Sequence, residues 1–325
     1  MTRISCPLIV CINFIEFLSP DLIFIRYIKE HTKNMAHRAT PSIDSAKVVN
    51  IASVVHRSPF RYPGGKTWLV PKVRQWLRNL QPAALELIEP FAGGAIVGLS
   101  ALFEGFVERL VLVEKDEDVG SVWQVLIHGD GLRLGEEIMS FELTNESAIR
   151  TLSTKPANEF DRAFATIVRN RVQRGGILAP GASLLKYGEN GKGIQSRWYP
   201  NTLNERIKAI VFHKQQMAFV AGDGIEFIRN NAFRESSAFF IDPPYTIAGR
   251  RLYKYSEINH EELFRVASTI RGDFLMTYDN VPEILSLAKQ YGFDTALVRM
   301  KNTHHELMNE LLIGKNLEWA RRSDS

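Results

Sequence analysis

The chain has 325 residues, of which 45% are hydrophobic and 23% are charged, and its formal net charge is +4. This composition is that of a globular protein and excludes a chain that is disordered or fibrous throughout. The length suffices for one large α/β domain with an insertion, or for two modest domains.

The N-terminal region differs from the rest of the chain. Residues 7–28 are apolar, but charged residues and a proline interrupt them too often for a membrane span, and a signal-peptide cleavage site is missing. The second methionine is Met35. We therefore expect residues 1–56 to be a poorly ordered extension, with 1–34 either a mis-assigned start or a loosely attached segment.

Cysteine is confined to Cys6 and Cys11. The main body therefore has neither a disulfide framework nor a cysteine metal site, which favours a reducing, cytoplasmic location and no metal.

Beyond this region, the pattern predicts alternating helices and strands. A helix is expected over 68–80. Short apolar runs predict strands at 84–88, 109–113, 216–221, 238–241, 273–277, 295–300 and 310–313. Helices are expected at 95–103, 225–231, 259–270 and 281–291. Because no helix separates the last two strands, the predicted fold is a doubly wound, mostly parallel seven-stranded α/β sheet with a terminal antiparallel hairpin.

Residues 156–215 interrupt this alternation with a helix to about residue 174, a glycine-rich stretch and a second helix over 204–211. Between residues 162 and 214, ten Lys and Arg residues stand against two acidic ones, so this part nets about +8 and the remainder about −4. A solvated basic face is one interpretation. We favour a mainly helical segment that binds a polyanion, inserted between two parts of a catalytic domain, 57–155 and 216–320.

The motif Asp242-Pro243-Pro244-Tyr245 directly follows the apolar run 238–241. Proline cannot donate to a sheet ladder, so the strand ends in a rigid turn at the sheet edge where ligands bind in open α/β sheets. A carboxylate, proline carbonyls and an aromatic ring at that edge suit a planar group with an amino substituent, such as adenine.

Three further strand tips carry acidic residues or glycines, and their order along the chain is the one expected of a site for a nucleoside cofactor. The turn Glu89–Gly94 lets a backbone approach a ligand closely, Glu114 is placed for ribose hydroxyls, and Asp223 for an adenine amino group. The phosphate-binding pattern G-x-G-x-x-G and a P-loop lysine are absent from the sequence, which argues against dinucleotides and nucleoside triphosphates. The ligand class that remains is an adenosyl compound without phosphates. Upstream of these motifs, Lys66 could pair with a carboxylate of such a ligand, for example that of a methionine moiety.

Taken in order, four motifs resemble those of the Dam-type DNA adenine-N6 methyltransferases, over about residues 59–316. They are Tyr62-Pro63-Gly64-Gly65-Lys66, Glu89-Pro90-Phe91-Ala92-Gly93-Gly94, Glu114 and Asp242-Pro243-Pro244-Tyr245. The resemblance implies a Rossmann-like methyltransferase fold and a site-specific enzyme that uses S-adenosylmethionine to methylate adenine in double-stranded DNA. The resemblance implies Tyr62, Lys66, Phe91, Gly93, Glu114 and Asp242 as cofactor residues, and the strand tips add Glu89 and Asp223.

Two departures from the family pattern concern the cofactor motifs: Ala95 stands where the family often has a second spaced glycine, and Tyr62 where it often has Trp. A third concerns the target site. The family's Asn-Arg-x-Gly-Phe-Asn-Gly stretch is here Asn170-Arg171-Val172-Gln173-Arg174-Gly175-Gly176, so no target sequence is implied. The expected DNA contacts are Arg169, Arg171, Arg174, Lys186, Lys192 and Arg197.

The expected catalytic residues are Asp242, Pro243 and Tyr245. Asp242 and the Pro243 carbonyl would accept the two hydrogens of the adenine amine, and Tyr245 would stack on the flipped base. Cytosine-N4 methylation is the nearest alternative, followed by RNA or protein-amide methylation and by a catalytically silent DNA-binding relative. A restriction endonuclease as partner is left open.

Overall fold

The structure is a computed structural model, and it describes residues 54–61, 65–176, 178, 184, 185, 188, 191–244, 258–301 and 307–321. These residues belong to one compact unit, Lys47–Ser325. Most of the expected N-terminal extension lies outside the described residues, as do three predicted site residues, Tyr62, Lys186 and Tyr245.

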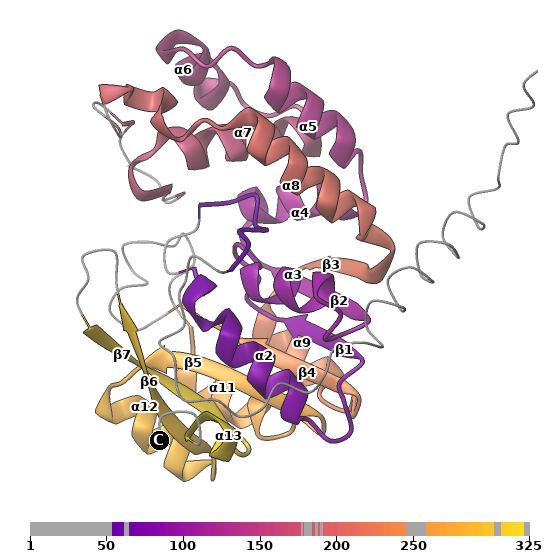
Figure 1. Cartoon of the computed structure of the whole chain (residues 1–325), viewed down its shortest axis with the longest axis vertical. Helices are drawn as coiled ribbons and strands as arrows, with labels where there is room; N and C mark the ends of the chain where they lie inside the picture. Colours follow the sequence, from indigo (N-terminus) through magenta and orange to yellow (C-terminus); the bar gives the residue numbers. More distant parts are fainter. Residues whose placement is uncertain are drawn as a thin grey trace, which may run out of the picture. The chain divides into compact units, whose positions relative to one another are not determined.

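The core of the fold is a seven-stranded sheet with the order β3-β2-β1-β4-β5-β7-β6 (Figure 1). The strands are β1 Glu86–Glu89, β2 Arg109–Glu114, β3 Met217–Ala221, β4 Ser237–Ile241, β5 Asp273–Asp279, β6 Asp294–Lys301 and β7 Leu307–Gly314. Strand β7 is antiparallel to both of its neighbours, β5 and β6, and the other pairs are parallel. The predicted doubly wound, mostly parallel seven-stranded sheet with a terminal antiparallel hairpin is thus confirmed.

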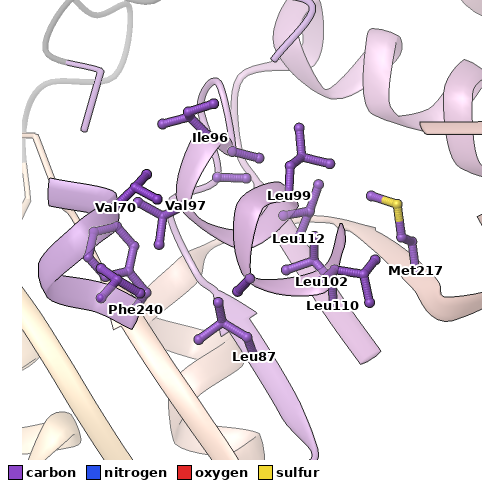
Figure 2. Packing of buried hydrophobic residues seen from close by; sticks show 14 of the residues in the cluster. Val70, Leu87, Ile96, Val97, Leu99, Leu102, Leu110, Leu112, Met217 and Phe240 are labelled. Atoms are coloured by element: carbon purple, nitrogen blue, oxygen red, sulfur yellow. The ribbon is translucent and has the colours of Figure 1, made fainter. Parts of the chain in front are cut away.

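Strands β2, β4 and β5 carry buried, mainly apolar runs because helices cover both faces of the sheet. Successive side chains point to opposite faces, so Leu87 belongs to one hydrophobic cluster and Ile88 to the other. In Figure 2, Leu87, Leu110 and Leu112 of the sheet lie near Leu99 and Leu102 of helix α3.

Two sets of helices cover these faces. On the Leu87 face lie α2 Val70–Asn79, α3 Ile96–Phe103 and α4 Glu117–Ile127. On the Ile88 face lie α9 Gly224–Asn231, α11 His260–Ala267 and α12 Pro282–Gln290. The short α13, Glu318–Arg321, packs beside α2. The ends of the predicted helices and strands agree with the observed ends within a few residues. Among the strands, the largest difference is at β7, which was predicted over 310–313 and spans Leu307–Gly314.

The chain between β2 and β3 is helical. After α4 come α5 Gly131–Ser140, α6 Asn145–Ser153, α7 Glu159–Val172 and α8 Pro200–Phe212. Short 3-10 turns cover Thr67–Leu69, Arg174–Gly176, Gly193–Arg197 and Lys214–Gln216. Helix α5 packs along α8, and α6 packs along α7. Two helices that precede residue 156, the predicted start of the inserted segment, therefore contact two helices that follow it. Helix α8 begins earlier than predicted because Pro200 takes its first position, where the missing N–H costs nothing.

Two negative findings apply to the described ranges. No helix there is long and apolar enough to cross a membrane. Likewise, no three His, Cys, Asp or Glu side chains in these ranges are grouped so that they could hold a metal ion.

Candidate functional site

A cavity of about 430 Å³ lies at the edge of the sheet where the parallel strands β1 to β4 end. Its volume is within the range of small-molecule sites, and its position is the one where open α/β sheets bind ligands. The lining residues are 89–97, 114–116, 223–225 and 65–67, together with His56, Ser58, Phe60, Phe240, Asp242, Pro244 and Ile258. The structure therefore brings together the predicted cofactor residues that it describes.

The turn after β1 forms one wall of the cavity. Gly93 and Ala95 adopt the left-handed backbone conformation, with φ of 46° and 48°. Ala95 is the position where the family often has glycine, and its positive φ is one that glycine adopts more easily. The Ala92 amide donates to the Val113 carbonyl (3.0 Å) and the Trp123 indole to the Gly93 carbonyl (3.0 Å). The turn is therefore tied to β2 and α4.

Glu114 lies across this turn, at the tip of β2. Its Oε2 accepts from the Gly93 amide (2.8 Å), and its Oε1 accepts from the amides of Lys115 and Asp116 (2.9 Å each). Burial raises the pKa of this carboxyl, although the three N–H donors oppose the shift. A carboxylate has about four lone-pair sites, so it can still accept a hydroxyl donor from a ligand.

Asp223 follows β3 and contacts the cavity, but both of its oxygens already have partners. Oδ1 caps α9 by accepting from the amides of Ile225 (2.9 Å) and Glu226 (3.2 Å). Oδ2 accepts from Lys115 Nζ at 3.0 Å. Burial would raise the pKa of Asp223, but these bonds outweigh it and lower the pKa overall. An adenine amino group would have to share Oδ2 with Lys115.

Glu89 is almost fully buried beneath the same turn, and its Oε1 accepts from the Gly98 amide of α3. Burial raises its pKa to about 8, with the charge of Asp242 adding to the shift and the Gly98 bond opposing it. A Cβ at Gly98 would lie 2.5 Å from Leu110 Cδ1 and 2.9 Å from Glu89 Oε1. Glycine at this position therefore allows α3 to approach β1 and reach the carboxyl.

Asp242, at the tip of β4, is held by two donors from other elements. Lys66 Nζ lies 3.0 Å from its Oδ1, and the Thr277 hydroxyl of β5 donates to the same oxygen at 2.7 Å. Lys66 Nζ is also 3.1 Å from Glu310 Oε1 of β7. Burial would lower the pKa of Lys66, but the two carboxylates outweigh it and raise the pKa overall. Lys66 was expected to pair with a cofactor carboxylate, whereas here it pairs with these two protein carboxylates.

The sequence reasoning missed three residues of this site: Lys115, Thr277 and Glu310. Two of them left a signal, because Thr277 is a polar residue within a buried strand and Glu310 precedes the apolar run 311–313. Buried polar groups need partners. The partners themselves could not be inferred, because no local spacing links Glu310 to Lys66.

The predicted DNA-contacting residues differ in solvent exposure and in their ion pairs. Arg174 and Lys192 are exposed and Arg197 is partly exposed. Arg169 pairs with Asp118 of α4 at 2.8 Å. Arg171 is only 3% exposed, so its side chain is buried within the fold.

Arg171 and its neighbour Asn170 instead hold the segment that leads to Lys66. The Arg171 guanidinium donates to the Pro59 carbonyl at 2.5 Å. The Asn170 side chain accepts from the Arg61 amide (2.8 Å) and donates to the Arg61 carbonyl (3.0 Å). Burial lowers the pKa of Arg171 to about 9, and the charges of Arg206 and Arg61 add to this effect.

No protein-family model matches the chain, and no curated protein matches it either. Among solved structures, it is similar to a candidate RNA methyltransferase from Pyrococcus horikoshii, with 11% identity, 88% of this chain and 96% of that chain covered, and a TM-score of 0.37. Precorrin-6y C5,15-methyltransferase from Geobacter metallireducens is 9% identical, with 76% and 85% covered and a TM-score of 0.33. A candidate methylase from Haemophilus influenzae is 10% identical, with 77% and 85% covered and a TM-score of 0.28. Such low identities and TM-scores identify neither the reaction nor the substrate of this chain.

Proposed function

We propose that the chain is a DNA methyltransferase that transfers a methyl group from S-adenosylmethionine to the N6 amine of an adenine flipped out of double-stranded DNA. The observation that carries this proposal is the arrangement around the cavity. An anchored carboxylate, Asp242, stands on one side, and the β1 turn with Glu114 stands on another.

The residues around the cavity fit an adenosyl cofactor without phosphates. The Glu114 carboxylate can accept ribose hydroxyls, and Phe91 and Ile225 provide apolar surface. Gly93 and Gly94 keep the turn free of side chains where a ligand would approach. When bound, S-adenosylmethionine supplies an electrophilic methyl group.

Asp242 and the Pro243 carbonyl would act on the substrate amine. Its lone pair is delocalised into the purine ring, so the nitrogen is a weak nucleophile. Two acceptors on its hydrogens would localise the lone pair and aim it at the methyl group. The nitrogen gains positive charge as the new bond forms, and the Asp242 carboxylate stabilises that charge.

DNA delivery is assigned to the basic segment, which we retain as residues 156–215, with 57–155 and 216–320 as the catalytic part. Arg174 and Lys192 are its exposed candidates for phosphate contacts. Tyr245 remains the proposed stacking partner of the flipped base, for which alanine substitution typically costs about 1–3 kcal/mol.

The direct test is to digest DNA from cells with and without the expressed protein to nucleosides and to search for methylated species by mass spectrometry. N6-methyladenine is expected with the wild type and not with Asp242→Ala, whose folding is checked by circular dichroism. If N4-methylcytosine were detected instead, the proposed target base would be cytosine rather than adenine. Methylation confined to RNA or protein would overturn the DNA substrate, and methylation of none of these would favour the silent relative.

A further inference from the structure

Lys66 is a buried cation shared by two carboxylates from different strands. Resting on the function proposed above, we propose that Glu310 is a positioning residue for methyl transfer that acts through Lys66 on the charge and orientation of Asp242. Neither the motif resemblance nor the cavity lining assigns a role to Glu310.

The topology explains how a residue of β7 reaches this site. Strands β1 to β5 run toward the cavity edge, whereas β7 is antiparallel to β5 and begins near that edge. Glu310 lies in register with Asp279, the last residue of β5. A side chain near the start of β7 is therefore brought to the edge where β4 ends in Asp242.

The geometry indicates an indirect role for Glu310. Lys66 and Glu310 are each 6% exposed, and Lys66 Nζ lies 3.1 Å from Glu310 Oε1 and 3.0 Å from Asp242 Oδ1. Lys66 and Asp242 line the cavity, but Glu310 does not. Glu310 can therefore influence a ligand through Lys66 and Asp242 without contacting it.

Charge balance gives this indirect contact a function. Lys66 paired with Asp242 alone would form a neutral pair, and the carboxylate would be a weak acceptor for an amine that is becoming cationic. With Glu310 ionised as well, the three groups carry a net charge of −1, so Asp242 keeps its stabilising effect. Among the described residues, the neighbouring ionisable groups include Glu89 and Asp279, whose burial raises their pKa values, and Tyr278, whose burial and proximity to Asp242 raise its pKa.

Orientation is the second consequence. Lys66 Nζ and the Thr277 hydroxyl contact the same oxygen of Asp242 from two elements, and Glu310 keeps the lysine ammonium in that position. This two-sided hold limits rotation of the carboxylate, and positioning of reacting groups is a large part of catalysis.

Glu310→Gln and Glu310→Asp separate charge from shape. The Gln variant keeps the side-chain length but loses the charge, whereas the Asp variant keeps the charge on a shorter stem. We expect kcat to fall about 10–100-fold in Glu310→Gln and less than about fivefold in Glu310→Asp. Removing a group that directly stabilises charge in a transition state costs about 100–1,000-fold, and Glu310 acts at one remove from the reacting atoms. The dissociation constant for S-adenosylmethionine, measured by calorimetry, should change less than about threefold, as Glu310 does not line the cavity.

The matched control is Glu86→Gln. Glu86 is a buried carboxylate that pairs with Arg234 at 2.8 Å, but it lies at the start of β1, at the opposite end of the strand from the cavity. This variant should lower the melting temperature while leaving kcat at the wild-type value.

Three outcomes would overturn the proposal while the wild type is active. These are a Glu310→Gln enzyme with wild-type kcat, a Glu310→Asp enzyme slower than Glu310→Gln, and a loss of cofactor affinity that accounts for the whole defect. A wild-type enzyme inactive on all DNA would instead refute the proposed function.

A double variant keeps the proposal testable if Glu310→Gln does not fold. Lys66→Met/Glu310→Met removes both members of the buried pair and leaves Asp242 held by Thr277. Because Glu310 acts through Lys66, we expect the kcat of this double variant to equal that of Lys66→Met alone. A double variant slower than Lys66→Met would show that Glu310 acts by another route and would overturn the proposal.

Discussion

At the scale of single residues, three of the carboxyl groups that line the cavity have partners that differ in kind. Glu89 has one backbone N–H, Glu114 has three, and Asp242 has a cation and a hydroxyl. Burial raises the pKa of both Glu89 and Glu114, and the N–H donors, which stabilise the charged form, oppose this shift. Glu89 has a single such donor and its pKa rises to about 8, so its protonated form is favoured at neutral pH.

Glu89→Gln tests this difference through the pH dependence of stability. Because burial raises the folded-state pKa of Glu89 from 4.5 to about 8, the wild type loses stability as pH rises through that window. The Gln variant cannot titrate and keeps an oxygen for the Gly98 amide. We expect its stability advantage over the wild type to grow between pH 5 and pH 8 by roughly 2–4 kcal/mol, since each pKa unit corresponds to about 1.4 kcal/mol.

Urea denaturation across this range measures the effect. Glu136→Gln, at an exposed position of α5, is the control and should give a curve parallel to the wild type. Parallel curves for Glu89→Gln and wild type would show that Glu89 is ionised in the folded protein.

At the scale of secondary-structure elements, the strands and their tips could be predicted because each depends on a local pattern. The apolar run 238–241 before Asp-Pro-Pro-Tyr is an example, and β4 ends at Ile241 as expected. Helices α4, α5, α6 and α13 were not predicted. The contacts of Asp242 with Thr277 and of Lys66 with Glu310 join residues far apart in the chain, so no window of sequence could indicate them.

Gly224 marks a close approach between two elements of the cavity. A Cβ at this position would lie 2.2 Å from the Pro90 carbonyl oxygen and 3.1 Å from Phe91 Cε1. We expect Gly224→Ala to push α9 away from the β1 turn and to destabilise the protein by about 1–3 kcal/mol, as overpacking usually does. Thermal denaturation measures the stability, and calorimetry should show weaker binding of S-adenosylmethionine.

Gly222→Ala is the matched control, because a Cβ there would meet nothing within 4 Å. It should keep both the melting temperature and the cofactor affinity near the wild-type values. Equal behaviour of the two alanine variants would contradict the close approach of α9 and the β1 turn.

Asp223 connects β3 to α9 and serves as the N-cap of that helix. Asn is as good a cap as Asp, and the ion pair with Lys115 is largely exposed, at 54% and 39% of the side chains, so it adds little stability. Asp223→Asn should therefore unfold at nearly the wild-type urea concentration, whereas Asp223→Ala should lose about 1 kcal/mol. Equal losses in both variants would instead assign the stability to the ion pair.

At the scale of the whole molecule, charge is distributed unevenly along the chain. Residues 162–214 net about +8 and the rest about −4. Part of this positive charge is used within the fold, since Arg162 and Arg169 pair with acidic residues of α4 and Arg171 is buried. Exposed residues such as Arg174 and Lys192 are the better candidates for an electrostatic contact with DNA.

This assignment predicts how DNA binding responds to salt. Each phosphate contact adds about −0.9 to the slope of log K against log salt concentration, so Arg174→Gln/Lys192→Gln should make the slope shallower by about 1–2. Fluorescence anisotropy with a labelled duplex at several salt concentrations measures it, and cofactor affinity should not change. Lys289→Gln, at an exposed position of α12 outside the basic segment, should keep the wild-type slope. If instead both variants changed the slope equally, DNA would be held by the net charge of the protein, and the segment 156–215 would have no special part in recognition.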